Sequence, residues 1–167
     1  MAGPRRRGPL PVPPPLGGIV VDGSNVIASS RARPIERLDL VSAWCRDWRP
    51  DLAVWVFLDH STYARCPLPA QRTLRARCED VTPGRARCVV CPRHESADVF
   101  VLQHARAHLA LVVSNDRYFD HEELRRNAIT VQFTLAGDRL EVHDEATWFR
   151  SPGAAQRVPM VDLQQRR

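Results

Sequence analysis

The chain has 167 residues, of which 44% are hydrophobic and 26% charged, a balance typical of one globular domain with a substantial core. No stretch approaches the roughly 20 apolar residues of a membrane span, and prolines interrupt the residues after Arg5–Arg7, so we expect a cytoplasmic protein with no membrane partner. The net charge of +5 and the exclusive use of arginine suit contact with phosphates, although a coding bias towards arginine explains the composition better.

Charge and cysteine content narrow the class of protein further. Without Arg5–Arg7, Arg166 and Arg167, 19 basic residues face 19 acidic ones, so the rest of the chain is near neutral. Five cysteines are an odd number, unlike a secreted disulfide framework. The C-x-x-C pair at Cys88 and Cys91 has no second pair at zinc-finger spacing, so we expect reduced, mostly buried thiols.

Composition divides the chain into three parts. Residues 1–16 are rich in proline, arginine and glycine, which predicts a disordered or polyproline-like tail. Residues 17–150 carry the strand and helix patterns of one domain. Residues 151–167 carry many polar side chains, and we expect them to form a loose C-terminal tail.

The hydrophobic pattern within residues 17–150 alternates between strands and helices. Short apolar runs predict strands over residues 18–22, 52–58, 87–91, 110–113 and 129–134, and a turn at 136–138 leads into an edge hairpin over 139–142. Helical spacing predicts helices over residues 35–48, 67–80, 97–109 (capped by Ser96) and 117–126. This alternation indicates an α/β fold in which a mostly parallel central sheet lies between two layers of helices.

Four aspartates are expected at the edge where the parallel strands end. Asp22 ends the first strand, Asp98 opens the helix after the third, and Asp116 follows the fourth, with Asp120 four residues later. Each alone is better explained as a helix cap. Together they bring repelling carboxylates to one edge, which a bound cation would offset, and oxygen ligands suit Mg²⁺ or Mn²⁺. Such a site is typical of metal-assisted phosphodiester hydrolysis.

Polar residues accompany two of these aspartates. Ser24 and Asn25 follow Asp22, while Ser114 and Asn115 precede Asp116. Side chains of this kind orient a carboxylate or contact the scissile phosphate. The candidate substrate-binding residues are Ser24, Arg93, Ser114, Asn115 and Arg117.

Three motifs resemble one known family. Residues 20–26 (VVDGSNV) are similar to the opening motif of the NYN/PIN-like nucleases, in particular their Regnase-type ribonuclease branch. Residues 97–102 (ADVFVL) resemble the acidic helix start of that branch, and residues 112–120 (VVSNDRYFD) its "VSND.Y.D" motif. The strand around residues 132–134 matches the segment that follows, so the resemblance covers about residues 19–142.

The resemblance implies a three-layer α/β/α PIN-like fold and Mg²⁺-dependent cleavage of single-stranded or stem-loop RNA, which leaves a 5′-phosphate and a 3′-hydroxyl. By matching positions it implies that the metal ligands are Asp22, Asp98, Asp116 and Asp120, with Asn25 beside Asp22 as a further catalytic residue. RNA is the expected partner. A homodimer, an antitoxin or another protein partner are left open.

The chain departs from the family pattern at two places. Relatives often carry two adjacent acids at the helix start, whereas here Ala97 precedes Asp98, so His94 or Glu95 would have to compensate. The chain also has no CCCH zinc finger. The single acid at Asp98 motivates an alternative in which the protein binds RNA without cleaving it. A metal-dependent DNA nuclease or phosphatase would use the same edge and is a further alternative.

An arginine-rich segment separates the second and third strands. Residues 65–93 contain seven arginines and only two acids, Glu79 and Asp80. A basic patch beside the acidic centre would hold an RNA backbone. For any single arginine, a solvated helix face is the better explanation. Tyr63, Tyr118 and Phe119 suit base stacking, but core packing explains them equally well.

Overall fold

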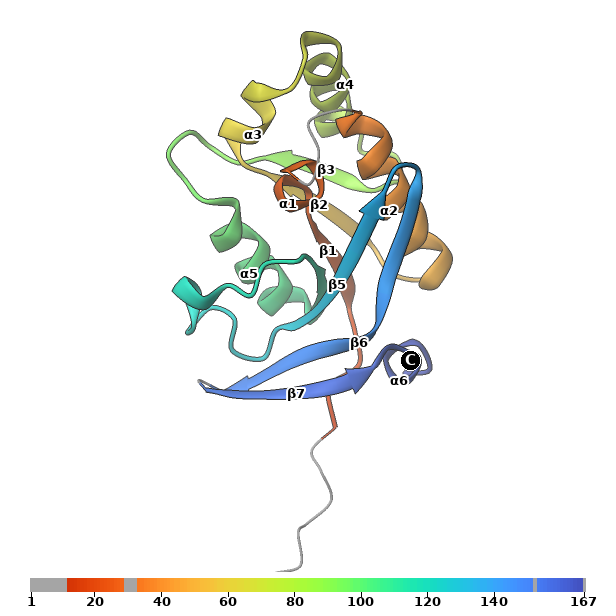
Figure 1. Cartoon of the computed structure of the whole chain (residues 1–167), viewed down its shortest axis with the longest axis vertical. Helices are drawn as coiled ribbons and strands as arrows, with labels where there is room; N and C mark the ends of the chain where they lie inside the picture. The colour runs from red at the N-terminus through yellow and green to blue at the C-terminus, as the bar shows by residue number, and fades with distance from the viewer. Residues whose placement is uncertain (1–11, 29–32, 152, 167) are drawn as a thin grey trace, which may run out of the picture.

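The computed structural model describes residues 12–28, 33–151 and 153–166, and within them the chain builds a seven-stranded sheet flanked by helices (Figure 1). The elements in chain order are β1 Gly18–Asp22, α1 Gly23–Ala28, α2 Pro34–Trp48, β2 Val54–Leu58, α3 His60–Arg65, α4 Leu68–Glu79, β3 Arg87–Val90, α5 Ala97–His108, β4 Ala110–Val113, the 3₁₀ turn η1 Phe119–His121, β5 Ile129–Ala136, β6 Arg139–Ser151, β7 Ala154–Pro159 and α6 Met160–Gln164.

The strands lie in the order β3-β2-β1-β4-β5-β6-β7. The pairs among β3, β2, β1, β4 and β5 are parallel, whereas β6 and β7 are antiparallel additions. Asp22 pairs with Phe57 of β2, and Val21 with Val113 of β4. The three neighbouring strands therefore end at the same edge, where loops and helix starts gather as expected for a parallel sheet.

The two faces of the sheet carry separate hydrophobic layers because alternate strand residues point to opposite sides. Ile19 and Val21 belong to the cluster that contains the buried residues of α2 and α4. Val20 and Val112 belong to the cluster around α5. Figure 1 shows α2 and α5 on opposite sides of the strands. The predicted three-layer α/β/α fold with a mostly parallel central sheet is thus confirmed.

The helix predicted over residues 117–126 is wrong. The chain forms only the 3₁₀ turn η1 and further turns there. Tyr118 has a φ of 50°, in the left-handed region that interrupts a right-handed helix. Its buried side chain is held by Asp22, which is 96 positions away. A helical hydrophobic period over this short segment gives no sign of that long-range contact.

The C-terminal segment packs on the domain, which differs from the loose tail expected over residues 151–167. Residues 154–164 form β7 and α6, and Leu163 is fully buried. Arg49, itself buried, donates from Nη1 to the Leu163 carbonyl at 3.1 Å. Leu16 also lies in the core, whereas residues 1–11 of the predicted N-terminal tail lie outside the described residues. The apolar residues of the C-terminal segment, such as Met160 and Leu163, decide its placement.

The cysteines are free and mostly buried, as their number and spacing predicted. All five cysteines are free thiols, of which Cys45, Cys66, Cys88 and Cys91 are buried. No helix among the described residues is both long enough and apolar enough to cross a membrane.

Candidate active site

Three of the predicted aspartates come from elements that meet at the carboxyl edge of the sheet. Asp22 is the last residue of β1, Asp98 lies in the first turn of α5, and Asp116 follows β4. Alternation along β1 turns Asp22 towards the α5 side of the sheet, the side from which Asp98 also comes. The parallel crossovers therefore bring together carboxylates that are far apart in sequence.

Asp22 is the most buried carboxylate of the site, with 2% of its surface exposed. Its Oδ1 accepts from the backbone N–H of Asn25 at 3.0 Å, as in a helix cap. Its Oδ2 accepts from the Ser114 hydroxyl at 2.9 Å and the Tyr118 hydroxyl at 3.0 Å. Burial outweighs these three hydrogen bonds and raises the pKa of Asp22 to about 6, with a smaller contribution from the charge of Asp98.

Asp98 is the centre of the electrostatic interactions among the acids. Burial raises the pKa of its carboxyl first, and the neighbouring charge of Asp116 raises it further, as does that of Asp59. His121 opposes the shift, with its Nε2 3.7 Å from Asp98 Oδ2. Since like charges disfavour one another's ionisation, these carboxylates form one interacting group.

Asp59 is a member of this group that the sequence reasoning missed. It follows β2, and its Oδ1 accepts from the backbone N–H of Ala97 at 2.7 Å, at the start of α5. Asp59 thus lies beside Ala97, at the helix start where the family pattern leads one to expect a second acid. His94 and Glu95, which were expected to compensate for that acid, are exposed in the loop before α5. The sequence could have indicated this residue, because Asp59 stands at the end of a predicted buried strand, as Asp22 does.

The polar neighbours of the aspartates hold the loops in place. Ser24 Oγ accepts from the backbone N–H of Asp59 at 2.7 Å, and Asn25 Oδ1 accepts from that of Asn115 at 3.0 Å. Asn115 Oδ1 accepts in turn from the backbone N–H of Phe133 at 2.9 Å. Ser114 joins two acids, since its hydroxyl donates to Asp22 and accepts from the Asp116 backbone N–H at 3.0 Å. These contacts give the polar residues a positioning role.

Gly23 allows the start of α1 to pack closely against β2. A side-chain carbon added to it would lie 2.9 Å from the Phe57 carbonyl oxygen and 2.8 Å from a methyl group of Val56. Only glycine lets α1 begin this close to β2.

Three other predicted residues lie outside the acidic group. Asp120 is exposed in η1, and no hydrogen bond or ion pair in the described part of the chain links its side chain to Asp22, Asp98 or Asp116. Arg93, in the loop before α5, donates from Nε to His60 Nε2 at 3.3 Å. Arg117 is exposed next to Asp116, and the two residues line one cavity of about 250 Å³. The ligand role of Asp120 stays a prediction.

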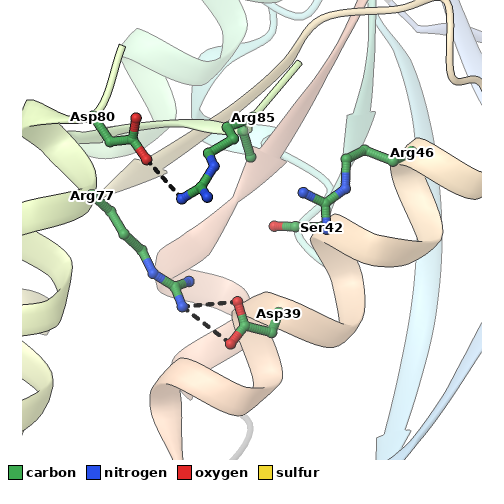
Figure 2. Close-up of a pocket in the computed structure, with 7 residues that line it drawn as sticks. Asp39, Ser42, Arg46, Arg77, Asp80 and Arg85 are labelled. Atoms are coloured by element: carbon green, nitrogen blue, oxygen red, sulfur yellow. Dashed lines mark hydrogen bonds and ion pairs between the residues drawn. The ribbon is translucent and has the colours of Figure 1, made fainter. Parts of the chain in front are cut away.

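The arginine-rich segment does not form one patch beside the acids. Arg77 pairs with Asp39 at 2.8 Å and Arg85 with Asp80 at 3.0 Å, in a cavity of about 270 Å³ that α2 also lines (Figure 2). The core residues of α2 belong to the cluster on the other side of the sheet from α5. These two arginines are thus partly neutralised and lie on the face away from the acids, because α4 packs against α2 and β3.

The donor atoms of the acidic group suit a hard divalent cation. They are carboxylate oxygens, the ligands that Mg²⁺ and Mn²⁺ prefer, and their mutual repulsion is what a cation relieves. As the side chains stand, residues 12–28, 33–151 and 153–166 contain no group of three or more histidines, cysteines, aspartates or glutamates positioned to hold a metal ion. The oxygen donors suit a divalent cation, but the side chains would have to rotate before three of them could coordinate it.

Solved structures similar to this chain include two of nuclear protein-only RNase P 2 (PRORP2) from Arabidopsis thaliana. One has a TM-score of 0.54 and 18% identity and covers 81% of this chain but 30% of that chain. The other has a TM-score of 0.55 and 15% identity and covers 75% and 29%. No family model and no curated protein matches the sequence. The chain thus spans less than a third of the PRORP2 chains, with which it shares the fold.

Proposed function

We propose that this protein is a metal-dependent endoribonuclease of the Regnase-type branch of the NYN/PIN-like family, acting on single-stranded or stem-loop RNA. The observation that carries the proposal is the convergence of Asp22, Asp98 and Asp116 at the carboxyl edge of the sheet, where burial and like charges raise the pKa of Asp22 and Asp98. Perturbed carboxylates of this kind concentrate at functional sites. The fold shared with protein-only RNase P adds support.

The residues of the site have two roles in the proposed reaction: some would hold the metal ion, and others position Asp22. Asp22, Asp98 and Asp116 would hold the ion, with the charge of Asp59 beside Asp98. A bound Mg²⁺ or Mn²⁺ lowers the pKa of water and neutralises charge on the scissile phosphate. Ser114 and Tyr118 keep Asp22 in one orientation through their hydroxyl groups. Their hydrogen bonds also favour the ionised carboxylate, the form that binds a cation.

One observation favours a second candidate, a protein of this fold that binds RNA without cleaving it. Ala97 replaces an acid, and the described residues present no ready group of three metal-binding side chains. If Asp59 remains committed to the backbone of α5, the site would hold an ion weakly. Such a protein would bind RNA in a salt-sensitive way and leave it intact with every divalent ion.

A cleavage assay separates the two candidates. Labelled single-stranded RNA, stem-loop RNA and single-stranded DNA are incubated with the full chain in Mg²⁺, Mn²⁺ or EDTA. We expect cleavage of RNA with metal and none in EDTA. Asp22→Asn and Asp116→Asn should each reduce the rate by more than roughly 100-fold, the upper range for losing a residue that only supports a metal ligand. Asp144→Asn, at an exposed position on β6, controls for the loss of a charge alone.

The cleavage assay tests each predicted residue separately. Cleavage that persists in both Asp22→Asn and Asp116→Asn would refute the site, and bound but uncut RNA under all metals would establish the second candidate. Asp120→Asn tests the remaining predicted ligand. A loss as large as that of Asp116→Asn would show that η1 moves towards the acids when the ion binds.

A further inference from the structure

A second cavity begins at the acidic group and continues over the antiparallel end of the sheet. It has a volume of about 250 Å³ and is lined by Asp116, Arg117, Phe119, Gln132, Phe149 and Arg157, among others. This volume is slightly below the range of roughly 300–1,000 Å³ typical of small-molecule sites, so the cavity suits one nucleotide unit. We call it the Asp116 cavity.

The floor of the Asp116 cavity is one face of the strands β5, β6 and β7. Thr130 of β5 pairs with Thr147 of β6, which pairs with Arg157 of β7, so the three side chains form a row across the strands. Thr130 is level with Val112 of β4, which faces α5. The floor therefore continues the α5 side of the sheet, the side on which Asp22 and Asp98 lie. α5 itself packs on β1, β2 and β4.

An exposed aromatic ring stands at the wall of this cavity. Phe119 is 66% exposed, a large value for a phenylalanine. The guanidinium of Arg125 lies 5.1 Å from the centre of the Phe119 ring and 4.7 Å from that of Phe149. Arg125 is buried and donates to the Arg117 carbonyl at 2.9 Å. Because one side of the Phe119 ring rests on a fixed cation, its open side is preorganised for stacking.

Two exposed arginines add positive charge at the rim. Arg117 lies next to Asp116 in sequence, and Arg157 comes from the C-terminal strand β7. Neither side chain forms an ion pair or hydrogen bond within the described part of the chain. Their guanidinium groups therefore keep all their donors for an anion, and phosphate suits the planar geometry of arginine. Gln132 contributes an amide to the same cavity, with Nε2 3.5 Å from the Asn115 carbonyl.

We propose that the Asp116 cavity is a subsite for one nucleotide of a single-stranded RNA, whose base stacks on Phe119 and whose phosphate contacts Arg117 and Arg157. The subsite rests on the proposed function, since it places the nucleotide next to the phosphate that the acids would cleave. A ring, an amide and two free arginines around one cavity are the combination by which proteins hold unpaired bases and their backbone. The strand β7 supplies the second arginine and thus becomes part of the RNA-binding surface.

The test measures binding separately from cleavage. The full chain carrying Asp22→Asn is titrated into a fluorescein-labelled single-stranded RNA of 12 nucleotides and into the same RNA with abasic positions, at several salt concentrations. Phe119→Ala should weaken binding of the intact RNA about 5- to 20-fold and leave binding of the abasic RNA nearly unchanged. Phe119→Trp, which keeps a stacking surface, should restore the affinity.

Loss of Arg157 should change RNA binding in a different way from loss of Phe119. Arg157→Ala should weaken binding of the intact and abasic RNAs alike and reduce the slope of log Kd against log salt by about 0.7, the value for one lost phosphate contact on a single strand. The matched controls lie on α4, where Leu68→Ala removes a 68% exposed apolar side chain and Arg72→Ala an exposed arginine. Both controls should leave the affinity unchanged.

The outcomes distinguish the subsite from the nuclease. The subsite is refuted if Phe119→Ala and Arg157→Ala bind like the two controls, or if Phe119→Ala weakens intact and abasic RNA equally. Cleavage is scored on the chain with Asp22 intact. Binding with the expected signatures but no cleavage would refute only the nuclease, whereas cleavage with unchanged affinities would refute only the subsite. A chain that neither binds nor cleaves RNA refutes both.

Discussion

Replacing Asp22 with asparagine should stabilise the folded protein at neutral and alkaline pH while abolishing its activity. Asp22 is 2% exposed, and burial raises its pKa from 3.8 to about 6. A carboxyl whose pKa is raised by folding binds its proton more tightly in the folded state. The native protein therefore loses stability as pH rises from about 4 through 6, and above that range the ionised carboxylate destabilises the fold.

The size of this effect follows from the gap between the two pKa values. At about 1.4 kcal/mol per pH unit, the gap corresponds to roughly 3 kcal/mol of unfolding free energy. Asparagine keeps the oxygen that accepts from the Asn25 N–H, and the Ser114 and Tyr118 hydroxyls can rotate to accept from its amide. We expect Asp22→Asn to gain up to about 3 kcal/mol at pH 8, or roughly 6–12 °C in Tm for a chain of this length.

Thermal unfolding in EDTA at pH 8 and pH 4 tests this reasoning. The difference in Tm between Asp22→Asn and the native chain should be large at pH 8 and nearly absent at pH 4, where the native carboxyl is protonated. Asp144→Asn, exposed on β6, serves as the control for a change of net charge. Adding Mg²⁺ at pH 8 should narrow the gap, because an ion offsets the charge only when Asp22 is present.

Two results would refute the argument about Asp22. One is an asparagine variant that is no more stable than the native chain at pH 8, which would mean that its three hydrogen bonds compensate for burial. The other is a stabilisation of the same size at both pH values. That result would show that the gain comes from packing or from the unfolded state and not from the ionised carboxylate.

Three further variants test other parts of the structure. Leu163→Ala should lower the unfolding free energy in urea by about 2–5 kcal/mol because it leaves a cavity in the core, and a negligible change would show that α6 does not dock. Tyr118→Phe removes a hydrogen bond from ionised Asp22, so the pKa of Asp22 should rise and the acidic limb of the pH–rate profile should move to higher pH; an unmoved limb would contradict this. Asp59→Asn should raise the Mg²⁺ concentration for half-maximal cleavage several-fold, since it removes a negative charge beside Asp98; an unchanged midpoint would assign Asp59 to capping alone.

Most of the candidate site was predicted from acids that stand at the carboxyl ends of buried parallel strands, and the same pattern could have identified Asp59. Asp22 and Asp116 follow buried strands, and parallel strands share one edge, so their convergence was predictable. Asp59 obeys the same rule at the end of β2, but the family motifs did not include it. Asp120 was assigned from the family motif and from its helical spacing after Asp116. The left-handed backbone of Tyr118 breaks that spacing, and no local pattern signals it.

The amino-acid sequence by itself predicted the alternation of strands and helices, the mostly parallel sheet between two layers of helices, and the placement of Asp22, Asp98 and Asp116 at one edge. These features depend on hydrophobic period and on the geometry of crossovers, both of which are local. Only the tertiary structure decided the docking of β7 and α6, the pairing of Arg77 and Arg85 away from the acids, and the raised pKa of Asp22. Each of these depends on which distant side chains bury or neutralise a group, and burial is a property of the whole packed chain.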